Sequence, residues 1–378
     1  MIERGRISSR QASILIYIVV IGTIFLFLPR ILLDMVPTGH FITIIGGLII
    51  ASLVFVFVFK MLLEKFPDDN IFQVSKIILG KYLGGLIGLM FIAGNLQIAS
   101  IQVRSLGEFF ITSIMPETPL SVFIIVMLIL VTMTASAGIE AIGRMAEFWI
   151  GVLVLSFFFI FIGALPELEI GRIQPLIRTQ DLPSVFLATI KMSTVYMQAM
   201  VIIFFFSYIN DKKYVLRDSL ISLSLAGLAL LITYILVVSL FSKDLVRHFV
   251  WPTLEMTRNI TVAGFFERIE VFFVIVWILM AYIKLSVFVY GASIGVAQIF
   301  NFKSHRWNPY LLAIPIYFLA FRPDNMPTVL RLVQAWEFGV RPAIFTLLIP
   351  SILIIVALIR GKGGTKDAAK KDSSSSDN

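Results

Sequence analysis

The chain has 378 residues, of which 58% are hydrophobic and only 14% are charged. Its mean hydropathy of +0.95 and its lack of cysteine exclude a soluble enzyme, a disordered chain and a disulfide-stapled scaffold, since soluble domains carry roughly 25% charged residues. The formal charge of +8 is explained by loops that face anionic lipid, so the bilayer and not nucleic acid is the predicted partner.

Ten membrane spans are predicted, because a spanning helix needs about 20 mostly apolar residues. Windows free of Asp, Glu, Lys and Arg mark them, except that Lys284 interrupts the eighth and the ninth is short. They are Gln11–Pro29, Phe41–Phe59, Tyr82–Val103, Thr118–Ile139, Phe148–Pro166, Met192–Asn210, Ser219–Ser242, Val271–Phe302, Trp307–Phe321 and Ala343–Ile359. The fold class is therefore an all-α membrane protein with one transmembrane domain over residues 11–360.

The two ends of the chain are predicted to be cytoplasmic, because this topology places more Lys and Arg in the inner loops than in the outer ones. Residues 1–10 form a cytoplasmic N-terminal segment. Residues 361–378 are rich in Lys, Gly and Ser and are predicted to form a disordered cytoplasmic tail. Thr328–Phe338 mixes apolar and polar residues, which indicates a helix lying flat at the headgroups.

The first span contains Ile21-Gly22-Thr23 near its middle. Gly lowers the cost of unwinding, and an unwound turn would expose backbone N–H and C=O groups to a ligand. The alternative is a close helix–helix contact through a small residue.

The third span is the most polar. Gln97, Arg104 and Glu108 share one helical face, and Asn95 and Gln102 share a roughly opposite one. Polar groups on both faces predict a central helix packed on several sides. Arg104 and Glu108 form either a structural i, i+4 ion pair or part of a polar path beside a site.

The sixth and eighth spans carry further polar residues. Thr194 and Gln198 lie deep enough to line a cavity, but no Gly or Pro occurs from Ser184 to Asn210, so no break is predicted there. Lys284 either snorkels to the interface or pairs with a carboxylate inside the bundle, for which Glu108 is a candidate.

Signatures of catalysis are missing from the sequence. It contains no P-loop, HExxH or GxSxG motif, and its three His fall in three separate loops. No enzyme activity, cofactor or metal site is predicted, and the most economical class is a permease-like solute binder.

An ordered set of short motifs resembles the spore germination permease family, the B subunits of nutrient germinant receptors, within the amino acid–polyamine–organocation transporter superfamily. The set includes Ile7-Ser8-Ser9-Arg10-Gln11, Ile21-Gly22-Thr23, Leu28-Pro29-Arg30, Phe66-Pro67, Met115-Pro116-Glu117-Thr118-Pro119, Gly138-Ile139-Glu140, Trp251-Pro252 and Phe266-Glu267-Arg268-Ile269-Glu270. The resemblance implies two inverted five-helix repeats, with a ligand at the midplane where helices 1 and 6 are broken.

The resemblance also implies function and site residues. Family members sense nutrients such as amino acids, sugars or nucleosides in the inner membrane of bacterial spores, with A-type and C-type subunits as partners. Carried over by position, the ligand-binding residues would be Gly22, Thr23, Gln97, Ile101, Arg104, Thr194, Tyr196, Gln198, Ser286 and Tyr290, and Glu108 and Lys284 would serve a polar path or coupling.

Two other functions compete with nutrient sensing. One is an amino acid transporter coupled to protons through Lys284 or Glu108. The other is a membrane scaffold that binds no ligand and only supports its A-type partner. Uptake by the isolated protein would favour the first, and a nutrient response unaffected by site substitutions would favour the second.

Overall fold

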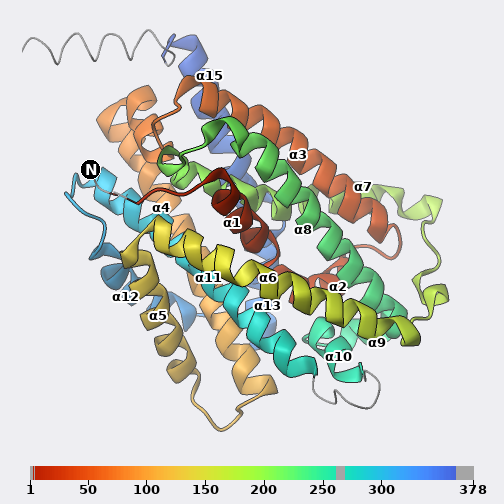
Figure 1. Cartoon of the computed structure of the whole chain (residues 1–378). Coiled ribbons are helices and arrows are strands. Elements are labelled where there is room, and N and C mark those ends of the chain that lie inside the picture. Colours follow the sequence, from red (N-terminus) through yellow and green to blue (C-terminus); the bar gives the residue numbers. More distant parts are fainter. Residues whose placement is uncertain (1–2, 4, 261–268, 363–378) are drawn as a thin grey trace, which may run out of the picture.

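The computed structural model describes residue 3, residues 5–260 and residues 269–362. Over these residues the protein is a bundle of helices (Figure 1). The predicted tail therefore lies outside the described residues from 363 onward, and the Phe266–Arg268 part of the last motif also lies outside them. The helices are α1 (Ser9–Ile21), α2 (Ile24–Met35), α3 (His40–Lys65), α4 (Ile71–Ser113), α5 (Leu120–Ala137), α6 (Ile139–Ala164), α7 (Leu182–Tyr196), α8 (Lys212–Leu240), α9 (Lys243–His248), α10 (Pro252–Asn259), α11 (Ile269–Ile299), α12 (Asn308–Ala320), α13 (Met326–Glu337), α14 (Val340–Ala343) and α15 (Ile349–Ile359).

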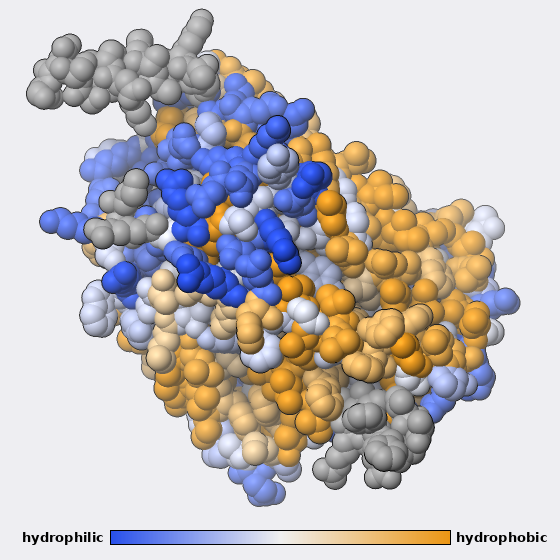
Figure 2. Space-filling model, in the orientation of Figure 1, coloured by the Kyte–Doolittle hydropathy of each residue, from blue (hydrophilic) through white to orange (hydrophobic). Residues whose placement is uncertain are grey.

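Within this described part, eight helical segments are long and apolar enough to cross a membrane, and the bent pair α1–α2 forms a ninth. The helix α12 is apolar but has only 13 residues. It corresponds to Trp307–Phe321, which the sequence analysis predicted to be a short span. Figure 2 shows apolar side chains over most of the visible face and hydrophilic ones gathered at the upper-left end. Figure 1 draws the N-terminus and the end of α15 at this same end.

Local sequence signals set several helix boundaries. A capping box starts α1, where the Ser8 hydroxyl accepts from the Gln11 N–H and the Gln11 side chain accepts from the Ser8 N–H. The same arrangement of Asn70 and Gln73 starts α4. Gly80, at φ 85°, then kinks α4 sharply before its long transmembrane part.

The centre of the bundle is formed by helices from both halves of the chain. The helix α1 contacts α6, α8 and α11, and α11 packs along α4. The helix α3 packs against α7 and α8. The predicted central position of the third span is therefore confirmed, since α4 also contacts α5, α12 and α13.

Candidate functional site

Three spans are interrupted, and residues beside each interruption meet in the core. The bent pair α1–α2 turns by 45° at Gly22 and Thr23. The helix α7 ends at Tyr196 and continues as a 3-10 helix, η4 (Met197–Phe204). The helix α13 ends at Glu337, and α14 follows only after Phe338 and Gly339.

The sequence prediction found no break signal in the sixth span, and Thr179–Phe204 indeed forms one candidate span, but the change from α-helix to 3-10 helix at Met197 was not predicted. A 3-10 helix keeps φ and ψ close to α-helical values, so the hydrogen-bonding pattern changes without a residue at positive φ. Neither Gly nor Pro is needed for such a change, and none occurs between Ser184 and Asn210.

The carboxylate of Glu337 connects the three interruptions. It accepts hydrogen bonds from Gln198 Nε2 at 3.0 Å and Gln102 Nε2 at 3.2 Å, and Lys284 Nζ lies 3.3 Å away. The Lys284 ammonium also donates to Thr23 Oγ1 at 3.0 Å. Because Lys284 is fully buried and Glu337 is only 6% exposed, each charge depends on the other for compensation.

Thr194 joins the break in the sixth span to the break after Glu337. Its hydroxyl lies 2.7 Å from the Lys191 carbonyl oxygen and 2.9 Å from the Glu337 carbonyl oxygen, which share its one proton, and it accepts from the Gly339 N–H at 2.9 Å. Displacement of the Glu337 backbone would therefore break or move the hydrogen bonds of Thr194 near the end of α7. The Thr194 hydroxyl is therefore engaged with the backbone on both sides of Phe338.

Gly22 allows α11 to approach the first break. A Cβ atom at this position would lie 3.3 Å from the Met280 carbonyl oxygen and 3.4 Å from Lys284 Cδ, and only 2.5 Å from the Ile18 carbonyl oxygen. The absence of a side chain thus lets the Lys284 stem reach Thr23. Both sequence interpretations of Ile21-Gly22-Thr23, a break and a close contact, hold at once.

Gly339 has φ 121° and ψ −142°, a conformation that is essentially restricted to glycine. We expect Gly339→Ala to destabilise the protein by about 1–3 kcal/mol through backbone strain alone, since an added Cβ would meet nothing within 4 Å. Thermal unfolding of the protein in detergent measures this loss. The control is Gly151→Ala inside α6, where a Cβ also meets nothing and a gain of about 0.5–1 kcal/mol is expected. Equal effects of the two substitutions would contradict the strain argument.

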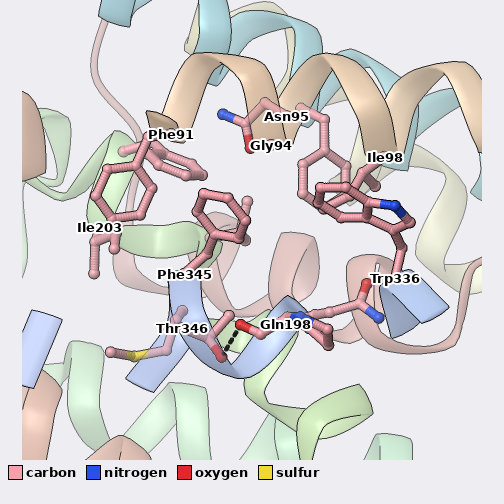
Figure 3. A pocket seen from close by; sticks show the side chains of 14 residues that line it. Phe91, Gly94, Asn95, Ile98, Gln198, Ile203, Trp336, Phe345 and Thr346 are labelled. Carbon is pink, nitrogen blue, oxygen red and sulfur yellow. Dashed lines mark hydrogen bonds between the residues drawn. The ribbon is translucent and has the colours of Figure 1, made fainter. Parts of the chain in front are cut away.

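A small cavity of about 40 Å³ adjoins the charged cluster. Gln198, Asn95 and Thr346 supply its polar lining, and Trp336 and Phe345 form part of its apolar wall (Figure 3). The cavity lies between α4, η4 and the segments that follow Glu337, so it is bounded by two of the three interruptions.

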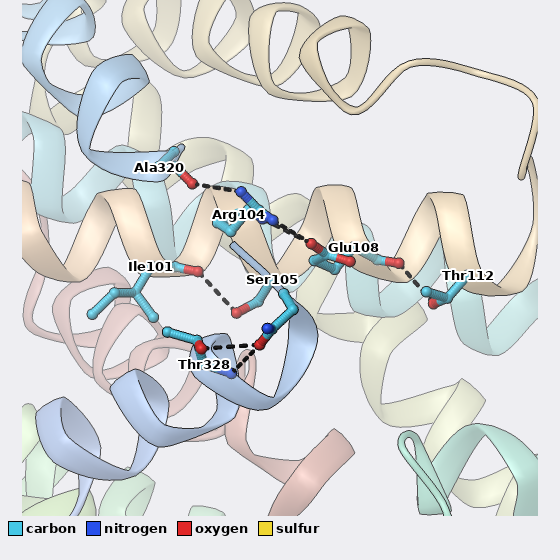
Figure 4. A network of polar contacts seen from close by, with 8 residues as sticks. Ile101, Arg104, Ser105, Glu108, Thr112, Ala320 and Thr328 are labelled. Carbon is cyan, nitrogen blue, oxygen red and sulfur yellow. Dashed lines mark hydrogen bonds and ion pairs between the residues drawn. The ribbon is translucent and has the colours of Figure 1, made fainter. Parts of the chain in front are cut away.

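Lys284 does not pair with Glu108, contrary to the candidate partner named from the sequence. Glu108 instead binds Arg104, at 2.9 Å from Nε and 2.6 Å from NH2, and Arg104 NH1 donates to the Ala320 carbonyl oxygen (Figure 4). Snorkelling of Lys284 is also wrong, because its side chain has no exposed surface.

Six of the predicted ligand-binding residues lie outside the cluster around Glu337, and one of them is Arg104, which binds Glu108. The Gln97 amide bonds to Ser100, the Ser286 hydroxyl bonds to the Tyr282 carbonyl of its own helix, and the Tyr290 hydroxyl donates to Glu3. Ile101 and Tyr196 are buried, and the Tyr196 hydroxyl has no hydrogen-bond partner among the described residues. The cluster brings together Thr23, Gln198 and Lys284, with Gly22 and Thr194 adjoining it. That these residues bind a ligand stays a prediction.

Sequence reasoning missed Glu337 and left Gln102 out of the site. Thr328–Phe338 was expected at the headgroups, but α13 belongs to one candidate span over Met326–Ile359 and carries Glu337 into the core. One signal was available: Glu337 is an isolated acid between Trp336 and Phe338, two residues before Gly339.

Comparisons with known proteins give consistent results. Residues 6–328 match the family described as spore germination protein. The spore germination protein YndE of Bacillus subtilis is 25% identical, covering 95% of this chain and 98% of YndE. Spore germination protein A2 of the same organism is 23% identical, covering 92% of this chain and 94% of its own length.

Among solved structures, that of MhsT in complex with L-phenylalanine superposes with a TM-score of 0.64 at 14% identity. The match covers 94% of this chain and 90% of MhsT, and it shows the fold alone. The predicted fold class, a helical membrane protein with the inverted-repeat transporter architecture, is confirmed, with ten as an approximate number of spans.

Proposed function

This chain belongs to the spore germination protein family, and from that membership and the geometry of its core we propose that it is a nutrient-sensing subunit of a spore germination receptor. It binds a small molecule beside Glu337 and signals to A-type and C-type partner subunits. We place it in the inner membrane of the spore, with both termini on the core side. Binding, without covalent chemistry, is the proposed activity.

One observation carries this proposal: residues beside three helix interruptions meet at one buried ion pair. Thr23, Gln198 and Glu337 come from three different spans, and Lys284 from a fourth links them. A ligand that changes these contacts favours one arrangement of the spans over another, and this differential affinity is the basis of a conformational signal.

A second function is supported by the same ion pair. Two ionisable side chains buried beside helix breaks are suited to a proton-coupled transporter of amino acids, since intramembrane ionisable residues commonly mark ion pathways. The structural neighbour MhsT was solved with L-phenylalanine. In this alternative, Lys284 and Glu337 exchange a proton during transport.

The test uses spores in which this chain and its partner subunits form the sole nutrient receptor. A panel of amino acids, sugars and nucleosides is scored by the nutrient concentration that gives half-maximal germination. We expect Gln198→Leu to raise this concentration at least tenfold, because it removes a donor to Glu337 and alters the cavity wall. The matched control Gln97→Leu, in α4 but bonded to Ser100, should leave it unchanged.

Three outcomes decide between the functions. Germination that responds to a nutrient and shifts with Gln198→Leu alone supports the sensing role. Uptake of the same nutrient by the isolated chain in proteoliposomes supports the transporter instead. A response that neither substitution changes, at normal protein levels, contradicts a ligand site beside Glu337 and leaves only the scaffold.

A further inference from the structure

A groove opens beside the sharp kink of α4, at the end of the bundle where α15 also ends (Figure 1). Its volume of about 340 Å³ is roughly eleven times the 30 Å³ that a water molecule occupies in the liquid, so it has room for a polar headgroup or a stretch of hydrocarbon chain. Its lining includes Lys76, Lys81, Tyr82, Leu86, Leu89 and Ile299.

The two lysines give the groove an uncompensated positive charge. The Lys76 ammonium donates to the carbonyl oxygens of Gln298 at 2.6 Å and Ile299 at 3.4 Å, which leaves one of its three N–H groups unused and its charge without a carboxylate. Lys81 is exposed, and no hydrogen bond or ion pair joins it to another described residue. The like charges of Lys76 and Lys81 act on each other, so an anion placed between them would relieve their repulsion.

The surroundings of the kink add more cations and no acids. Arg360 NH1 donates to the Ile78 carbonyl oxygen at 2.7 Å, and Lys362 Nζ donates to the Ile77 carbonyl oxygen at 2.6 Å. These neutral acceptors do not cancel the two charges. The parts of α4, α11 and α15 that meet at this end belong to stretches of the sequence without Asp or Glu. These stretches are residues 70–107, 271–321 and 338–362. An anion from outside the chain is therefore the natural counter-charge.

The rest of the groove is apolar and faces the lipid. Tyr82, Leu86 and Leu89 are exposed and follow Lys81 along one face of α4. Gly85 lies on the same face, and a Cβ atom added there would meet nothing within 4 Å. Exposed apolar side chains on a membrane-spanning helix contact hydrocarbon, so the groove joins a cationic end to a surface for an acyl chain.

We propose that this groove binds one anionic phospholipid of the surrounding bilayer. The lipid phosphate contacts the ammonium groups of Lys76 and Lys81, and one acyl chain lies over Gly85 beside Leu86 and Leu89. Basic pockets between transmembrane helices are typical sites for such headgroups. A zwitterionic phospholipid offers the same chain but no net charge to the cations, so the groove selects by headgroup charge. The proposal does not depend on the nutrient site beside Glu337.

The experiment uses the natural absence of cysteine from the chain, since a single introduced cysteine carries a fluorophore at one known place. In Met90→Cys the label is exposed one residue after Leu89 and outside the groove lining. The full chain is placed in vesicles of phosphatidylcholine and phosphatidylglycerol, and one of the two lipids carries bromine atoms that quench the label on contact. The control Phe158→Cys, on an exposed face of α6, reports the bulk bilayer.

We expect the label at Met90→Cys to show an apparent affinity for phosphatidylglycerol at least about fivefold that for phosphatidylcholine, since each juxtamembrane cation contributes about a factor of five. The label at Phe158→Cys should show no preference. In the Met90→Cys background, Lys81→Gln should lower the preference about fivefold. The matched control Lys213→Gln, an exposed cation at the start of α8, should leave it unchanged. Gly85→Leu should weaken quenching by both lipids, because the added side chain occupies the groove.

Three results overturn the proposal. Equal quenching by the two brominated lipids at Met90→Cys would show that the groove does not select an anionic headgroup. Equal losses for Lys81→Gln and Lys213→Gln would assign the preference to the overall charge of this end of the bundle. Relief of the phosphatidylglycerol quenching by millimolar inorganic phosphate, at constant ionic strength, would make the groove a site for free phosphate instead of a lipid.

Discussion

Replacing Glu337 with alanine is expected to destabilise the folded protein by about 3–5 kcal/mol, the usual cost of removing one partner from a buried ion pair. The substitution leaves Lys284 without a counter-charge at a fully buried position. It also removes the acceptor for the NH2 groups of Gln102 and Gln198. Denaturant unfolding in detergent micelles, followed by tryptophan fluorescence, measures the change.

The control is a second substitution that removes the other charge. In Lys284→Met combined with Glu337→Leu neither charge of this pair remains, so most of the lost stability should return, since apolar replacements of a buried pair are often neutral or stabilising. Glu255→Ala, which breaks an exposed ion pair with Arg258, should cost less than about 1 kcal/mol. A loss below about 1 kcal/mol for Glu337→Ala would show that Lys284 does not depend on Glu337.

The buried lysine could be read from the sequence, but its partner could not. Lys284 stands inside an apolar run, so burial and a carboxylate partner followed from the cost of an isolated charge. Glu337 lies in an amphipathic helix, whose pattern is equally typical of an interfacial segment. Tertiary packing against α4 decides between these locations, and a single sequence does not contain that information.

The third span gives a similar lesson. The helical spacing correctly separated Gln97, Arg104 and Glu108 from Gln102, but spacing does not say which face meets the site. The structure turns Gln102 toward Glu337 and gives Arg104 and Glu108 a separate network. The face with more polar residues therefore holds the Arg104–Glu108 ion pair, and the opposite face contacts Glu337 through Gln102. The break at Gly22 could be predicted because a glycine-containing turn is a local signal in the sequence.

Replacing Arg104 with alanine is the second change for which we expect a loss of about 3–5 kcal/mol. Arg104 and Glu108 are 5% and 6% exposed, so Glu108 would remain as a buried charge without its cation. The same arginine donates to the Ala320 carbonyl oxygen at the last residue of α12 (Figure 4). A cation at a helix C-terminus also stabilises the helix dipole, so the short helix α12 loses its cap.

An ion pair on the surface with the same sequence spacing serves as a control, because it separates the effect of burial from the effect of spacing. Glu140 and Arg144 in α6 are also an i, i+4 pair, but Arg144 is 72% exposed. Arg144→Ala should therefore cost only about 0.3–0.5 kcal/mol, although the sequence spacing of the two pairs is the same. Arg104→Lys should fall between the two, because an ammonium keeps the charge but cannot reach Glu108 and Ala320 with the geometry of a guanidinium. Equal losses for Arg104→Ala and Arg144→Ala in denaturant unfolding would mean that the ion pair in α4 is solvated, and that Arg104 does not cap α12.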